Sequence, residues 1–212
     1  MRETDWDNMF LADSPYKYKT FRRKEDSRAF PAQWTFGLKR GLQVPTGLNP
    51  GQRVQWLLNR ITLPYGTLES FDDLPTPFRA VATDLETGEA VVLGDGDLVT
   101  AMRASISAPG VFIPVEKDGR ILVDGGLSEN LPIDIARSMG VDRLIVVDVG
   151  FPLQTRERLQ SVGTISNQML AILIRRGSDA QRRTLAPDDL LLDPQLGDAS
   201  SFDFAGIPRA IR

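Results

Sequence analysis

Residues 121–132 read Ile-Leu-Val-Asp-Gly-Gly-Leu-Ser-Glu-Asn-Leu-Pro. The apolar run at 121–123 predicts a buried strand that ends at Asp124. A carboxylate at the C-terminal end of a sheet strand points into the crevice where α/β folds bind ligands. Gly125 and Gly126 allow a sharp turn and a close approach to a substrate or a neighbouring loop. Asp124 is therefore a candidate proton acceptor, although Asp-Gly pairs also occur at ordinary strand-to-turn junctions.

The residue types that the chain lacks narrow its chemistry. Its 212 residues contain no histidine and no cysteine. These residues cannot form a Ser-His-Asp triad, so a base among them has to be a carboxylate or a lysine. They also offer no thiolate nucleophile, no disulfide framework and no zinc–thiolate site.

Composition and charge indicate an ordinary globular protein. The chain is 42% hydrophobic and 25% charged, with a formal net charge of −3, which argues against a nucleic-acid-binding face. The N-terminal residues show no apolar signal-peptide core. The apolar run at 169–174 is far shorter than the ~20 residues that span a bilayer. Compartment and oligomeric state stay open.

Hydrophobic spacing and turn residues predict strands alternating with helices around the motif. Strands are expected at 78–83, 90–93, 111–115, 120–123, 144–149 and 189–193. Helices are expected from Asn49-Pro50 to Pro64, and at 98–107, 132–139 and 155–176, with a further helix start at 207–212. Gly163 is expected to interrupt the helix at 155–176. Asp118-Gly119 predicts a hairpin turn, and Gly140 predicts a helix C-terminus.

The apolar run at 144–149 is typical of a strand that is buried on both faces of a parallel sheet. With the strand at 120–123 and the helix at 132–139, it predicts a right-handed βαβ unit. Such units also occur in nucleotide-binding folds. The sequence has no Gly-x-Gly-x-x-Gly or Walker A loop, however, which disfavours a nucleotide binder.

Three serines near the motif are assigned to structural roles. Ser128 follows Gly126-Leu127, but its surroundings lack the closing glycine and the small neighbours of a nucleophile elbow. Ser105 and Ser107 are expected to pack beside the site at the end of a helix. The sequence therefore offers no serine in a Gly-x-Ser-x-Gly context.

Two clusters of charge have simple explanations. The aspartates of 94–97 predict a turn, because the alternating ligands and distal Glu of a calcium-binding loop do not follow. The basic run at 22–24 is followed at once by Glu25-Asp26, which predicts a solvated loop with local ion pairs. A contact with anionic headgroups is the alternative for the basic run.

Three blocks of sequence together resemble the bacterial patatin-like phospholipases. They are 71–84 with its continuation to Glu89, Arg103-Ala104-Ser105 with 109–115, and 122–126 with Asn130-Leu131-Pro132. Their order and spacing match the family over roughly residues 15–205, and the middle blocks are highly specific.

The resemblance implies an α/β fold, namely a three-layer α/β/α sandwich with a mostly parallel central sheet. It implies a lipid acyl hydrolase with a Ser-Asp dyad, which agrees with the absence of histidine. Asp124 of Asp124-Gly125-Gly126 would be the base that activates the serine, and water would then release the fatty acid from an acyl-enzyme. The substrate would be a lipid or phospholipid at a membrane surface, and the dyad requires no metal or other cofactor.

The sequence departs from the family pattern in one respect. In the family the nucleophile lies in Gly-x-Ser-x-Gly, and a glycine-rich loop with an arginine forms the oxyanion hole; these 212 residues contain neither. We therefore expect one partial patatin-like domain, N-terminally incomplete and inactive alone. Its parts would be an irregular region at about 1–48, a core at about 49–150, and C-terminal helices with a last strand at about 151–212. The alternative is a non-catalytic lipid- or partner-binding relic of the same fold.

Overall fold

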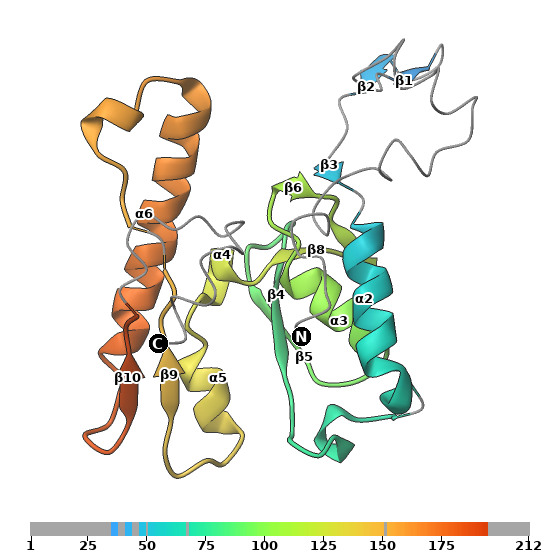
Figure 1. Ribbon diagram of the computed structural model, residues 1–212, viewed down its shortest axis with the longest axis vertical. Helices are drawn as coiled ribbons and strands as arrows, with labels where there is room; N and C mark the ends of the chain where they lie inside the picture. Colours follow the sequence, from blue (N-terminus) through green and yellow to red (C-terminus); the bar gives the residue numbers. More distant parts are fainter. Residues whose placement is uncertain are drawn as a thin grey trace.

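The computed structural model describes residues 35–37, 41–43, 47–49, 51–66, 68–150 and 152–194 (Figure 1). The basic run at 22–24 and the helix start expected at 207–212 lie outside these residues. Helices and strands are both present, so the predicted α/β class is confirmed.

The main sheet of the described residues is antiparallel. Its strands, in spatial order, are β5 (Ala90–Leu93), β4 (Ala80–Asp84), β8 (Arg120–Asp124) and β7 (Val115–Lys117). Asp118 and Gly119 join β7 to β8 with φ of 52° and 74°, the left-handed pair that a two-residue hairpin turn requires. The predicted strands at 78–83, 90–93 and 120–123 are confirmed to within two residues. The expected mostly parallel central sheet is not confirmed by the described residues, because every strand pairing in their main sheet is antiparallel.

One face of the main sheet is covered by helices. α3 (Leu98–Ser105) lies against β4 and β8, and α2 (Gln52–Thr62) packs on α3 (Figure 1). α3 begins where Asp97 accepts the Thr100 N–H at 2.8 Å, as expected of an N-cap aspartate. The core between this helix and the sheet consists of small and medium apolar side chains: Phe71, Ala80, Ala82, Leu93, Ala101, Ala104 and Leu122. Phe71 opens the short 3₁₀ helix η3 (Phe71–Asp73).

Two predictions in this part need correction. The helix expected from Asn49-Pro50 begins at Gln52, because Asn49 belongs to β3 (Gly47–Asn49); it is followed by the 3₁₀ helix η2 (Leu63–Tyr65). The strand expected at 111–115 is divided into β6 (Gly110–Phe112), which pairs in parallel with β3, and β7. Pro114 lies between them and has no N–H for a continuous ladder.

Within the region expected to be irregular, β1 (Thr35–Gly37) and β2 (Gly41–Gln43) form an antiparallel pair.

A second group of elements is built on a parallel pair of strands, β9 (Ile145–Val147) and β10 (Leu190–Leu192). α5 (Ile133–Ser138) and α6 (Val162–Arg182) accompany it, and Leu131, Ile133 and Leu144 form its buried cluster. The helix expected at 132–139 and the strand expected at 189–193 are confirmed, and Gly140 follows the C-cap residue of α5, Met139, with a φ of 79°. The helix expected at 155–176 consists of the short 3₁₀ helix η4 (Arg156–Arg158) and α6. The break precedes the Ser161–Thr164 capping box and does not fall at Gly163.

The predicted βαβ unit at 120–149 is wrong. β8 belongs to the main sheet, whereas β9 pairs with β10 in a separate one. β9 is also not buried on both faces, since Ile145 and Val147 are 72% and 50% exposed. Val146 packs against the buried cluster of Leu131, Ile133 and Leu144, whereas Ile145 and Val147 on either side of it are uncovered.

Candidate active site

Asp124 lies where the two groups of elements meet. It is the last residue of β8, and a short helix that the sequence did not predict, α4 (Gly126–Glu129), follows at once. α4 contacts both β4 of the main sheet and α6 of the second group (Figure 1). The Asp-Gly-Gly motif therefore turns the chain from one group to the other.

The two glycines are required by close packing. A Cβ at Gly125 would lie 2.2 Å from the Val81 carbonyl oxygen, which belongs to the backbone of the neighbouring strand. A Cβ at Gly126 would lie 3.0 Å from Asp124 Oδ1 and 3.1 Å from Asn130 Oδ1. Gly125 thus lets the turn cross β4, and Gly126 leaves room for the Asp124 carboxylate.

Three hydrogen bonds from the surroundings hold the backbone of Asp124 and Gly125. The Asp124 N–H donates to the Ser107 carbonyl at 3.0 Å, and the Gly125 N–H donates to the Ser105 carbonyl at 3.4 Å. The Thr83 hydroxyl donates to the Asp124 carbonyl at 2.8 Å. The prediction that Ser105 and Ser107 pack beside the site is confirmed. Thr83 was missed, although a hydroxyl in an otherwise apolar buried strand signals a polar partner.

The carboxylate has one oxygen engaged and one available. Asp124 Oδ1 accepts the Gly126 N–H at 2.8 Å, and the described residues place no hydrogen-bond donor on Oδ2. Burial raises the pKa of Asp124 above its ordinary value, and the Gly126 N–H opposes part of that rise. A higher pKa makes a carboxylate a better proton acceptor, so Asp124 is suited to take a proton from a hydroxyl group placed at Oδ2.

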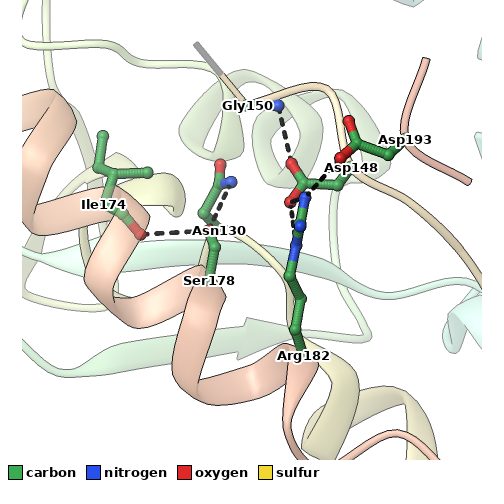
Figure 2. A network of polar contacts seen from close by, with 7 residues as sticks. All are labelled: Asn130, Asp148, Gly150, Ile174, Ser178, Arg182 and Asp193. Atoms are coloured by element: carbon green, nitrogen blue, oxygen red, sulfur yellow. Dashed lines mark hydrogen bonds and ion pairs between the residues drawn. The ribbon is translucent and has the colours of Figure 1, made fainter. Parts of the chain in front are cut away.

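Two other aspartates share this local geometry, and an arginine lies near the second oxygen of each. Asp84 accepts the N–H of Glu86, two residues on, and its Oδ2 lies 3.8 Å from Arg120 Nε. Asp148 accepts the N–H of Gly150 at 2.8 Å, and its Oδ2 is bound by Arg182 (Figure 2). Of these three strand-end aspartates, Asp124 is the one whose carboxylate remains open.

A second polar network fixes the chain just after the site. The Asn130 side chain donates to Ser178 Oγ of α6 at 3.1 Å, and Ser178 donates to the Ile174 carbonyl (Figure 2). One turn further along α6, Arg182 binds Asp148. These contacts tie α6 to the segment after α4 and to the end of β9.

Ser128 is engaged in the wall of the site. It lies within α4, and its Oγ lies 2.8 Å from Thr83 Oγ1 and 3.3 Å from the Gly125 carbonyl. The Ser128 hydroxyl has one proton, which it can donate either to Thr83 Oγ1 or to the Gly125 carbonyl. This arrangement agrees with the expectation that Ser128 is not a nucleophile.

Other kinds of site find no support in the described part of the chain. Its His, Cys, Asp and Glu residues do not gather in threes that could hold a metal ion. None of its helices combines the length and apolarity needed to cross a membrane. In the turn at 94–97, Asp97 caps α3, as described above, and Asp95 forms an isolated bridge with Ser70.

The described elements form an α/β fold with an open, half-buried aspartate at the end of a strand. Comparison with known proteins specifies the class of protein. The family model for patatin-like phospholipases matches residues 5–137, so the chain belongs to the patatin-like phospholipase family.

Curated relatives match a shorter part of the chain. An uncharacterized NTE family protein of Mycobacterium tuberculosis is 44% identical over 80 residues, which are 38% of this chain and 22% of the relative. Patatin-like phospholipase domain-containing protein 7 of Mus musculus is 44% identical over 81 residues, or 37% of this chain and 6% of the relative. The corresponding protein 6 of Homo sapiens is 43% identical over 84 residues, or 39% and 6%. The chain thus spans a small fraction of the length of these relatives.

Proposed function

We propose that this chain is part of a lipid acyl hydrolase with a Ser-Asp dyad, in which Asp124 is the base. The single observation that carries the proposal is the Asp124 carboxylate, whose Oδ1 is fixed by Gly126 while Oδ2 stays open. Membership of the patatin-like phospholipase family supports a lipid or phospholipid as the substrate, taken from a membrane surface.

The proposed reaction has two halves. Asp124 accepts the proton of a serine hydroxyl while the serine oxygen attacks the ester carbonyl, and the alcohol leaves with a proton from Asp124. Water then attacks the resulting acyl-serine and gives a proton to Asp124, which passes it to the serine oxygen as the acyl–serine bond breaks and the fatty acid is released. Neither step requires a metal or another cofactor.

The nucleophile is proposed to come from outside these 212 residues. The sequence contains no Gly-x-Ser-x-Gly, and Ser105, Ser107 and Ser128 serve the walls of the site. In this proposal the chain is a single partial patatin-like domain, the complete domain is the three-layer sandwich of the family, and the 212 residues alone are inactive.

Labelling with a fluorophosphonate, which reacts with activated serines, tests the dyad. The complete natural polypeptide that contains this sequence should be labelled on one serine, and Asp124→Asn should slow labelling by about 10²- to 10⁴-fold. Asp84→Asn is the matched control, because Asp84 has the same local turn at the end of a neighbouring strand. The 212-residue chain should not be labelled. Equal labelling of the Asp124→Asn variant would contradict the proposal, and an unlabelled, folded complete polypeptide would favour a non-catalytic lipid- or partner-binding relic.

A further inference from the structure

We propose that Arg103 and Ser107 act together as positioning residues for Asp124. They shape the segment 105–107, whose carbonyl groups accept the N–H groups of Asp124 and Gly125. The contribution of this unit to hydrolysis rests on the proposed function, but its effect on the Asp124 backbone does not.

Arg103 is a buried guanidinium with fixed surroundings. It is 5% exposed, its Nη1 donates to Ser107 Oγ at 2.6 Å, and its Nη2 donates to the Ile113 carbonyl at 3.3 Å. The guanidinium carbon lies 4.5 Å from the centre of the Phe112 ring. The planar fork of arginine can reach two acceptors and a ring face at once, which a lysine ammonium cannot.

Gly51, the N-cap residue of α2, also packs against the Arg103 guanidinium. A Cβ at Gly51 would lie 2.5 Å from Arg103 Nε, so the backbone of Gly51 packs directly on the guanidinium. Burial lowers the pKa of Arg103. Because the desolvation of a buried charge is unfavourable, the contacts of the guanidinium have to be specific ones.

Ser107 transmits this arrangement to the motif. Its side chain is completely buried, accepts from Arg103 Nη1, and donates back to the Arg103 carbonyl at 2.7 Å. The same residue provides the carbonyl that accepts the Asp124 N–H, and Ser105 provides the one that accepts the Gly125 N–H. Two hydrogen bonds thus separate the Arg103 side chain from the backbone that carries the proposed base.

Amide hydrogen exchange on the 212-residue chain tests the inference without any need for activity. Arg103→Met keeps an apolar stem over Phe112 but removes the fork, and Ser107→Ala removes the hydroxyl. Each should lower the protection of the Asp124 and Gly125 amides about tenfold, the effect of losing one hydrogen bond. The Asp148 amide, which donates to the Leu192 carbonyl at 2.9 Å, should be unchanged. Arg176→Met, at an exposed position on α6, is the matched control.

The pKa of Asp124, measured by carboxyl NMR, gives a second readout. It distinguishes a purely electrostatic effect of Arg103 from a positioning effect, because the two shift the pKa in opposite directions. Loss of a positive charge alone would raise the pKa of Asp124. Loss of positioning admits water to the carboxylate and should lower the pKa in Arg103→Met and in Ser107→Ala.

Unchanged protection of Asp124 and Gly125 in both variants would overturn the inference. So would an equal loss at Asp148, or the failure of both variants to fold, because either result would show a general structural role. The two claims can fail separately. If Asp124→Asn loses fluorophosphonate labelling but Arg103→Met and Ser107→Ala show no exchange effect, the proposed function is supported and the positioning role is wrong.

Discussion

At the scale of single residues, the burial of Asp124 makes its carboxylate a better base and the folded protein less stable. The pKa of Asp124 is raised on folding, so the native state binds this proton more tightly than the unfolded chain. Stability therefore falls as pH rises from the ordinary aspartate pKa of ~3.9 through the raised value, and the loss persists at neutral pH.

Asp124→Asn should consequently be at least as stable as the natural sequence at pH 7. The asparagine Oδ1 can still accept the Gly126 N–H, and the side chain at position 124 no longer carries a charge. Urea unfolding at pH 7 measures this. A clearly lower free energy of unfolding in the variant would show that Asp124 has a stabilising structural role instead.

The two glycines of the motif should differ in their tolerance of a methyl group. Gly125→Ala is expected to lose roughly 3 kcal/mol of stability, because its Cβ would meet the rigid backbone of Val81. Gly126→Ala should lose less, because its Cβ would meet the side chains of Asp124 and Asn130, which can shift by a few tenths of an ångström. Thermal and urea unfolding of both variants measure the order, and equal losses would contradict this packing.

Much of the candidate site could be predicted from the sequence at this scale, and the limit has a physical reason. The strand end and the two glycines are local features, so the sequence alone makes Asp124, Gly125 and Gly126 candidates. Asp84 and Asp148 also lie at strand ends, and the arginines beside their carboxylates in three dimensions could not be predicted from the sequence. Thr83 was missed because its contact with Asp124 depends on strand pairing across 41 residues of sequence.

At the scale of elements, Asp189 joins α5 to both strands of the parallel pair. It forms an ion pair with Arg137 of α5 and accepts the N–H groups of Leu144 and Ala186 at 2.9 and 2.7 Å. The hydrogen bond from Arg137, followed by those backbone donors, lowers the pKa of Asp189 to about 2.

This lowered pKa predicts a specific acid response. The stabilising contribution of Asp189 is complete above its unfolded pKa of ~3.9 and is lost as pH falls towards about 2. Asp189→Asn should be less stable at pH 7, and its stability should change less than that of the natural sequence between pH 4 and pH 2. Urea midpoints measured across this range test the prediction, and parallel curves for the two proteins would contradict it.

The existence of elements was easier to predict than their pairing. Residues 90–93 and 132–139 form the expected strand and helix because their hydrophobic spacing and turn residues are local signals. The strand at 120–123 pairs with β4 and β7, and not with β9, because partner choice depends on the whole sheet. A short apolar run such as 144–149 does not reveal how many of its faces are covered.

At the scale of the whole molecule, two apolar surfaces of the second group are exposed. Ile145, Val147, Leu190 and Leu192 share one face of the β9–β10 pair. On α6, the exposed apolar residues are spaced at helical intervals: Val162, Ile165, Met169 and Leu173. Parallel strands are normally covered on both faces, so these surfaces favour association.

The purified 212-residue chain should therefore bind a hydrophobic dye and self-associate as its concentration rises. Met169→Glu with Leu173→Glu should reduce both effects by placing charges on the α6 surface. Leu63→Glu is the control, because Leu63 is 79% exposed but lies on η2, outside these surfaces. Dye fluorescence and sedimentation velocity measure the outcome. A monomeric natural chain without dye binding would contradict the prediction.

The central claim, that Asp124 is the base of a Ser-Asp dyad, is tested most directly by one measurement. It is kcat/KM for hydrolysis of a fatty acyl ester by the complete natural polypeptide, compared with its Asp124→Asn and Asp84→Asn variants. We expect a loss of about 10²- to 10⁴-fold in Asp124→Asn and near-natural activity in Asp84→Asn. Full activity in a folded Asp124→Asn variant would contradict it.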